Sequence, residues 1–460
     1  MALQLHRAPR ADQLADQLAG LLSTPPPDPF ASEVVAVPAR GVERWLSQRL
    51  SHRLGAGPTG GDGVCAGVQF LSPRSLVSLL LDRDRDDVWD PDRLVWPLLE
   101  VLDASLDEPW AATLAAHLGH GLTGDEGELR RSRRWSVSRR LAGIFASYAV
   151  QRPSLVADWR EGRDTDGAGS PLDGDLAWQP ELWRRLLVQV GESPPDVRHA
   201  ETLKRLREGD RAALARLDLP DRLSLFGHTR LPVTEVELLA ALGEQRDVHL
   251  WLPQPSPALW EELRGLGGVV AREGDPSADR VHHPLLASLG RDTRELTRVL
   301  DGVGIEAPGP AELEQRATLL GWLQHDLRSN RAPDETVRAS RVPTADDRSL
   351  QVHACHGASR QVDVLREVLV GLLDDDPTLE PRDILVMCPD IETYAPLIAA
   401  GFGLEGVVED GHPAHRLRVR LADRALSSTN PLLGVAARLV ELAGGRVTAS
   451  EVLDLAGADV

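Results

Sequence analysis

The sequence predicts an α/β protein in which open parallel sheets carry helices on both faces and a large helical domain is inserted into the first sheet. Three observations predict this class: short β-type runs, helical patterns that follow them, and one long interval between two runs. Continuously apolar runs are typical of parallel strands that are buried on both faces. The runs are residues 34–37, 223–226, 248–252, 350–354 and 384–388.

A turn signal follows each run, and helical patterns follow most of them. After the first run, residues 38–41 form a turn, and Val42, Leu46 and Leu50 then fall on one face of a helix. The same spacing recurs at residues 236–242 and 362–373, after the second and fourth runs. Alternation of strand and helix predicts parallel sheets covered on both faces.

The interval at residues 38–222 is far too long for a single crossover, so it predicts an inserted domain. Apolar residues at helical spacing over 137–148 and 182–190 predict that this insert is helical. The predicted domains are residues 1–71 with 221–325 (first α/β domain), 72–220 (insert), 326–348 (a polar linker) and 349–460 (the start of a second, incomplete α/β domain).

Composition excludes several classes of protein. The chain has 460 residues, 42% of them apolar, and a formal net charge of −19, which disfavours a free-standing, non-specific nucleic-acid binder. The three cysteines are scattered, and no apolar stretch approaches the roughly 20 residues of a membrane span. We therefore expect a cytoplasmic protein with no membrane partner.

The turns that follow the predicted strands lack the chemistry of a nucleotide site. An ATPase needs a glycine-rich loop with a lysine after its first strand and carboxylates for magnesium after another. Lys204 is the only lysine, and it lies in a helical stretch with no glycine loop before it. The first turn reads Pro-Ala-Arg-Gly at 38–41 and the second Gly-His-Thr-Arg at 227–230. We therefore expect no catalytic residue and no bound cofactor in this chain.

Other candidate sites are weak. His353, Cys355 and His356 cluster at one predicted strand end, but 356 would face away from the other two, so their side chains do not converge on a metal. No serine-hydrolase, zinc-protease or cysteine-nucleophile motif is present. The missing lysine also argues against a PD-(D/E)xK nuclease centre.

Arginines recur at the predicted ligand edge. Arg40 and Arg44 follow the first run, Arg230 follows the second and Arg360 the fourth, and a further cluster spans residues 130–140 of the insert. The planar guanidinium suits phosphate because it donates two parallel hydrogen bonds. Because arginine replaces lysine almost everywhere in this chain, some of these residues are simply solvated surface.

Several segments resemble the RecC family, the gamma subunits of exodeoxyribonuclease V in the RecBCD helicase-nuclease complex. The similarity runs in order along the whole chain and is most specific at residues 352–398. Members of this family are more than twice as long, so the chain is similar to their N-terminal part. The segments are DPF at 28–30, AVPARGVERWLSQRL at 36–50, FASYAVQRP at 145–153, WQPELW at 178–183, VHACHGASRQVDVLREVL at 352–369, DDDPTLEPRDILVMCPDIETYAPLI at 374–398 and ADRALSSTNPL at 422–432.

The resemblance implies a superfamily 1 helicase fold whose ATP site has decayed, and a scaffold role in double-strand-break repair and recombination. It implies two partners, a RecB-like helicase-nuclease and a RecD-like helicase, which would hold the ATP and magnesium. It also implies contact with single-stranded and forked duplex DNA, the 3′ strand being guided through a channel. Two alternatives stay open: a protein scaffold without DNA contact, and an α/β hydrolase or nuclease with an unrecognised site.

The resemblance also implies which residues face the DNA. Channel positions in hotspot-recognising relatives correspond here to Pro38, Arg40 and Arg44 and, in the insert, to Gly143, Ile144, Ala146 and Arg152. Only Arg152 keeps the relatives' residue type, while carboxylates of that helix have become Gly143 and Ala146. The predicted DNA-binding residues are Pro38, Arg40, Arg44, Ile144, Arg152, Arg230 and His356.

Overall fold

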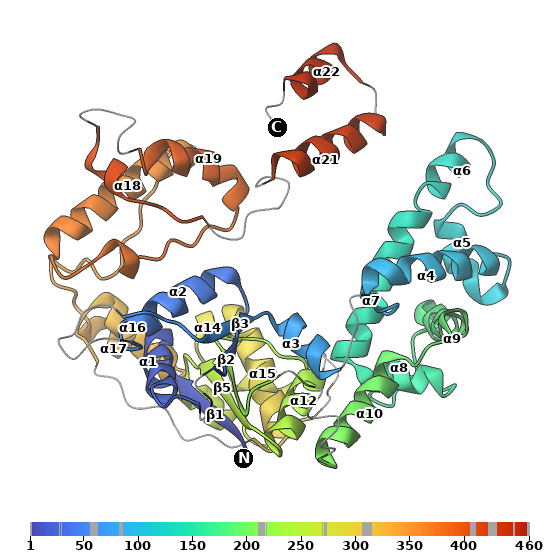
Figure 1. The fold of residues 1–460 in the computed structure, drawn as a ribbon, viewed down its shortest axis with the longest axis horizontal. Helices are drawn as coiled ribbons and strands as arrows, with labels where there is room; N and C mark the ends of the chain where they lie inside the picture. The colour runs from blue at the N-terminus through green and yellow to red at the C-terminus, as the bar shows by residue number, and fades with distance from the viewer. Residues whose placement is uncertain are drawn as a thin grey trace. The chain divides into compact units, whose positions relative to one another are not determined.

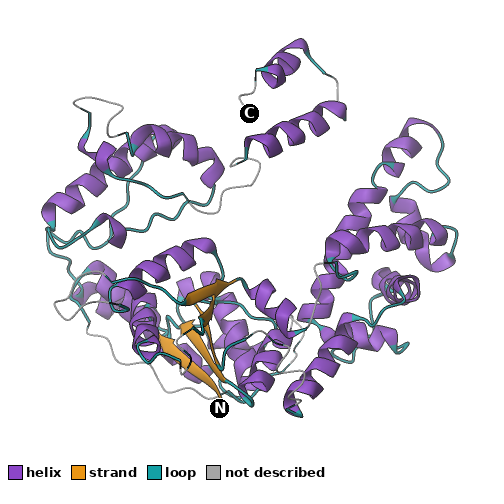
Figure 2. Cartoon of the chain, in the orientation of Figure 1, coloured by secondary structure: helices purple, strands orange, loops and turns teal. Residues whose placement is uncertain are grey.

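The computed structural model describes residues 2–26, 28, 30–55, 63–81, 86–209, 217, 219–268, 270, 274–305, 315–404, 411–421, 430–444 and 447–457. Its contacts divide the chain into two units, residues 1–38 with 42–347 and residues 39–41 with 348–460. The first unit contains a sheet and a group of helices with a core of their own, and the second contains only helices and loops among its described residues (Figures 1 and 2).

The first unit is built on a five-stranded sheet in which every neighbouring pair of strands is parallel. The strand order is β1-β5-β4-β2-β3. The central strands β2, β4 and β5 contain the apolar runs predicted from the sequence, and their side chains are almost all buried. The strands are β1 (Ala2–Ala8), β2 (Glu33–Ala36), β3 (Val68–Leu71), β4 (Arg222–Phe226) and β5 (Asp247–Pro253).

Helices pack on both faces of this sheet because alternate side chains of each strand point to opposite sides. Val35 and Trp251 pack with α1 (Ala11–Leu22) and α2 (Arg40–Ser51). On the other face Val34 and Leu250 pack with α3 (Pro73–Leu80), α12 (Val233–Gly243) and α15 (Arg291–Gly302). The architecture is therefore α/β with a parallel sheet, as the sequence predicts.

A second core holds the helices that lie between β3 and β4. Its centre is aromatic: the ring of Trp183 lies 5.6 Å from that of Trp89 and 5.4 Å from that of Phe145, between ring centroids. The described regular elements between these two strands are all helical. After α3 they are α4 (Pro91–Ser105), α5 (Ala112–His117), α6 (Gly124–Arg131), α7 (Arg134–Gln151), α8 (Pro153–Arg160), α9 (Trp178–Val190) and α10 (Pro195–Arg207), with short 3-10 turns η1 (Pro109–Ala111) and η2 (Gly174–Leu176).

Further helices follow β5 in the first unit and make up the second. In the first unit they are α13 (Pro257–Glu262), η4 (Pro276–Arg280), α14 (Pro284–Leu289), α16 (Leu319–Arg328) and α17 (Glu335–Ser340), the last two in or beside the predicted linker. The second unit contains α18 (Gly357–Asp375), η5 (Pro381–Asp383), α19 (Ile391–Gly401), η6 (Pro413–Arg416), α21 (Pro431–Ala443) and α22 (Ala449–Ala456). None of the helices described is long and apolar enough to cross a membrane.

The structure corrects the predicted strands in two ways. Strands β1 and β3 are additional, so the run at 34–37 belongs to the second strand of the sheet. The prediction of strands at residues 350–354 and 384–388 is wrong. A strand is stable only where its backbone pairs with a neighbour, and no ladder forms among residues described in the second unit. The side chains of Val352 and Met387 accordingly stand in solvent.

Candidate nucleic-acid interface

The carboxyl edge of the sheet contains a topological switch point between β2 and β4. From β2 the chain crosses through α2 to β3, whereas from β4 it crosses through α12 to β5, on the opposite side. Ligands of open α/β sheets bind at such a crevice. The turns that follow β2 and β4, which begin at Val37 and Gly227, meet at this edge because Ala36 pairs with Leu225. The candidate interface is therefore built around these two turns.

The turn after β4 is closed by buried hydrogen bonds. Gly227 has a φ of +76°, a conformation that favours glycine, and its N–H donates to the carbonyl of Trp251 at 3.0 Å. His228 is 3% exposed, and its Nε2 lies 3.3 Å from the carbonyl oxygen of Ala36 on β2. Burial lowers the pKa of His228 to about 4, so the imidazole is neutral and donates that bond. The Nε2–H of His228 is thus engaged with the Ala36 carbonyl, and Mg²⁺ prefers oxygen ligands to an imidazole nitrogen.

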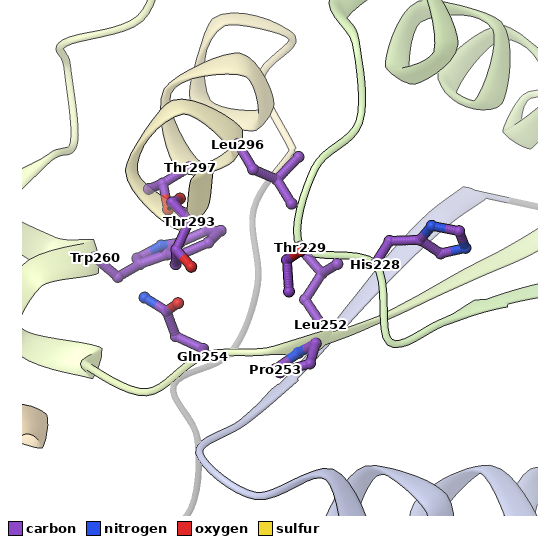
Figure 3. A pocket seen from close by; sticks show the side chains of 9 residues that line it. All are labelled: His228, Thr229, Leu252, Pro253, Gln254, Trp260, Thr293, Leu296 and Thr297. Atoms are coloured by element: carbon purple, nitrogen blue, oxygen red, sulfur yellow. Dashed lines mark hydrogen bonds between the residues drawn. The ribbon is translucent and has the colours of Figure 1, made fainter. Parts of the chain in front are cut away.

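A small hollow lies beside this turn, between the ends of β4 and β5 and α15 (Figure 3). Its enclosed volume is about 10 Å³, enough for about one water molecule and far below the roughly 300–1,000 Å³ of ordinary ligand pockets. Figure 3 shows Gln254, Trp260 and Thr293 facing one another, with the ring of His228 turned away from them. The amide of Gln254 is buried and donates to the carbonyl of Ser256. Among the described residues, no charged side chain lines the hollow, which is therefore poorly suited to a triphosphate.

The predicted residues of the sheet edge are accessible. Pro38 and Arg230 are exposed, and they follow neighbouring strands. Arg40 is the first residue of α2, and Arg44 lies one helical turn further on, so the two exposed guanidinium groups share one side of the helix. The turn residues 37–41, 227–230 and 253–256 contain neither lysine nor a carboxylate. The chemistry of these turns is that of anion contact.

The end of α7 lies beside the start of α12, which follows the turn after β4. The hydroxyl of Thr234 donates to the carbonyl of Val150 at 2.9 Å, and this bond joins the insert to the sheet. Arg152 follows directly as an exposed residue between α7 and α8. Ile144 is half-buried against the aromatic core of the insert. Arg152 follows shortly after Val150, and Arg230 comes shortly before Thr234. The Thr234–Val150 hydrogen bond therefore joins the segments that contain these two arginines.

His356 belongs to the second unit, where it is the exposed residue before α18. The neighbouring His353 forms a hydrogen bond with the side chain of Gln351, and the thiol of Cys355 points to the carbonyl of His353. Among the residues that the structure describes, no group of three or more metal-ligating side chains gathers anywhere.

One unusual group escaped the sequence analysis. Glu235 lies in the first turn of α12, and burial raises the pKa of its carboxyl to about 7. No hydrogen bond or ion pair to its side chain is found within the described parts of the chain. The only signal in the sequence is an acidic residue inside the apolar segment VTEVELLAALG.

We expect this chain to bind no ATP. The turns at the switch point offer guanidinium groups but no phosphate loop and no carboxylate to hold magnesium. Titration of the purified chain with Mg-ATP in a calorimeter should give only the heat of dilution. A saturable signal of micromolar affinity, abolished in Arg40→Ala, would contradict this expectation.

The fold and its edge define a doubly wound α/β protein whose crevice, as far as the structure describes it, lacks the groups of a nucleotide site. The family model for the RecC N-terminal domain matches residues 3–330. The chain therefore belongs to the RecC family, and the resemblance seen in its motifs is confirmed.

Curated relatives agree with this assignment. The chain is 59% identical over 462 residues to the RecBCD enzyme subunit RecC of Mycobacterium tuberculosis strain H37Rv, and the match covers 100% of the chain and 41% of that protein. It is 59% identical over 469 residues to the protein of the same name from Mycolicibacterium smegmatis, with 99% of the chain and 40% of that protein covered. The Escherichia coli K12 protein of that name is 28% identical over 474 residues, with 93% and 40% covered. The chain thus spans about 41% of the length of the relatives it matches.

Proposed function

We propose that the chain is a non-motor scaffold subunit of a RecBCD-type helicase-nuclease that acts in double-strand-break repair and recombination. Its partners would be a RecB-like helicase-nuclease and a RecD-like helicase, and these would hold the ATP and magnesium. Family membership supports this role, because the relatives are named as subunits of the RecBCD enzyme. A decayed superfamily 1 helicase fold is consistent with the parallel sheet and its switch point.

The observation that carries the proposal is the chemistry of the carboxyl edge. Arginines occupy the turns where a motor would hold a phosphate loop and a magnesium pair. A guanidinium prefers phosphate oxygens or the O6 and N7 of guanine, so Arg40 and Arg44 suit a single-stranded nucleic acid. We propose that this edge and the end of α7 line the channel that guides the unwound 3′ strand. Gly143 and Ala146 offer no side-chain acceptor, so we expect either no hotspot response or a response to a different sequence, such as a G-rich one.

The test is a reconstitution of the chain with its two partner subunits on forked DNA. We expect Arg40→Ala plus Arg44→Ala to weaken single-strand binding and to make its salt dependence shallower, by about 0.7 in slope for each phosphate that is no longer neutralised. Arg207→Ala plus Arg280→Ala, two exposed arginines outside these turns, is the matched control. Binding curves by fluorescence anisotropy over a salt series measure the slope.

Two results would count against the proposal. An unchanged slope in the Arg40 and Arg44 variant would remove these residues from the channel and favour a protein scaffold without DNA contact. The wild-type assembly can be compared on duplexes with and without the relatives' hotspot. Altered cleavage at the hotspot would contradict the predicted change in sequence specificity.

A further inference from the structure

Two tryptophan side chains lie together on the surface of the insert. Trp96 comes from α4 and Trp135 from the first turn of α7, two helices that pack side by side (Figure 1). Their ring centroids are 4.6 Å apart, and the ring planes are tilted by 54°. The exposed fractions are 60% for Trp96 and 42% for Trp135. Trp183, by contrast, is fully buried in the insert core. Packing of the insert therefore does not account for the exposed pair.

Two arginines follow Trp135 along α7. Arg139 lies one turn after Trp135, and Arg140 follows it. Both are exposed, and neither forms an ion pair within the part of the chain described. Arg134 is different, because it forms an ion pair with Asp103 of α4 at 2.8 Å.

Acidic groups face the pair from α4. Asp92 and Glu100 lie one turn before and one turn after Trp96. The carboxylate of Glu100 accepts a hydrogen bond from Gln189 of α9 at 2.6 Å. The excess of positive charge is therefore on α7, beyond Trp135. A ligand that places its charge over Arg139 and Arg140 and its apolar face on the rings fits this distribution.

A single strand of nucleic acid has both features. Its unpaired bases stack on aromatic rings, and its phosphates pair with guanidinium groups. We propose that Trp96 and Trp135 form a stacking platform for unpaired bases and that Arg139 and Arg140 bind the adjoining phosphates. This inference rests on the proposed function, to which it adds a contact site on the insert. From Trp135, α7 runs about 25 Å, at ~1.5 Å per residue, to its end beside Arg152, so the platform and the channel would lie at opposite ends of this helix.

Anisotropy of a fluorescent deoxythymidylate oligonucleotide, titrated with the purified 460-residue chain, tests the platform. We expect Trp96→Ala plus Trp135→Ala to weaken binding about tenfold or more, because the protein can no longer stack at least one base. Trp96→Phe plus Trp135→Phe keeps two ring faces and should keep most of the affinity. Phe30→Ala removes an aromatic ring that is 94% exposed outside the insert and should have no effect. Arg139→Gln plus Arg140→Gln should lower the salt slope.

Cross-linking identifies the contact directly. An oligonucleotide that carries 5-iododeoxyuridine should cross-link to Trp96 or Trp135 on irradiation. Unchanged melting of the variants would show that they fold, as expected for exposed side chains.

Each remaining outcome separates the two proposals. Failure of the wild-type chain to bind the oligonucleotide would overturn the proposed DNA contact and the platform together. Equal binding by the wild type and the alanine pair, with cross-links elsewhere, would overturn the platform alone. If the Trp96→Ala plus Trp135→Ala protein bound DNA with unchanged affinity but failed to assemble with the partner subunits, the two tryptophans would belong to a protein interface. That result would also overturn the platform.

Discussion

Trp183→Ala should lower the free energy of unfolding of the insert by about 3–5 kcal/mol, the cost of truncating a large buried aromatic side chain. Trp183 is fully buried, and its ring contacts those of Trp89 and Phe145. Its removal would leave a cavity between α9, α7 and the segment before α4, which the rigid surrounding helices cannot fill. Because Arg152 directly follows α7, we expect DNA binding to weaken together with stability.

Urea unfolding followed by circular dichroism and intrinsic fluorescence measures this effect. Val188→Ala on the same helix is the matched control, because Val188 is 83% exposed and its truncation leaves no cavity. A Trp183→Ala protein as stable as the Val188→Ala protein would show that the aromatic core does not hold the insert together.

The second large effect is on pH dependence and comes from His228. Its folded pKa of about 4 lies below the 6.5 of an unperturbed histidine, so between these values the unfolded chain binds more protons. The free energy of unfolding should therefore fall as pH drops from about 6.5 to 4, by up to about 3 kcal/mol from this residue. His228→Gln keeps a donor for the Ala36 carbonyl and should make the loss of stability toward low pH smaller. The contribution of His6, whose pKa burial also lowers to about 4, would remain.

Glu235 acts in the opposite direction. Its folded pKa of about 7 lies above the ordinary 4.5, so its neutral form contributes stability that is lost as pH rises from about 4.5 through 7. Glu235→Gln should raise stability at pH 8 by roughly 2 kcal/mol, a figure reduced for partial contact with water, and have little effect at pH 4.5.

Urea melts across a pH series separate these two limbs. His117→Gln, at an exposed histidine of α5, should leave both limbs unchanged. If the free energy of unfolding changed with pH in the same way in the wild type and in His228→Gln, His228 would not change its protonation on unfolding. The same comparison with Glu235→Gln tests Glu235.

Strands that are buried on both faces could be predicted from the sequence, and edge strands could not. β4 and β5 have the apolar runs that parallel packing demands. β1 contains Gln4, His6 and Arg7, and it is a strand because tertiary contacts accommodate these polar side chains. His6 stacks on Trp251 at 3.8 Å between ring centroids, and the Arg7 guanidinium lies over the ring of Trp260. Residues 384–388 differ from β1 in the opposite way. They have the apolar composition of a strand but form none, because no partner strand is described there.

The candidate interface could be predicted only in part. The absence of a phosphate loop is a property of the sequence itself, and the arginine positions follow once the strand ends are known. The hydrogen bond from Thr234 to Val150 joins residues far apart in the chain, so no local pattern indicates it. The burial of His228 and Glu235 likewise depends on neighbours from other elements.

The strand order also determines when the sheet can assemble during synthesis on the ribosome. Leu5 of β1 aligns with Leu250 of β5, and Val35 of β2 with Ser224 of β4, so both early strands pair with segments translated after the insert. At about 5–20 residues per second, β1 waits roughly 10–50 s for its partner. The insert has its core within residues translated before β4, so it can fold during this interval. The nascent chain can therefore carry a folded helical domain while β1 has no partner strand and β2 has only β3, which leaves apolar strand surface open to aggregation during this interval.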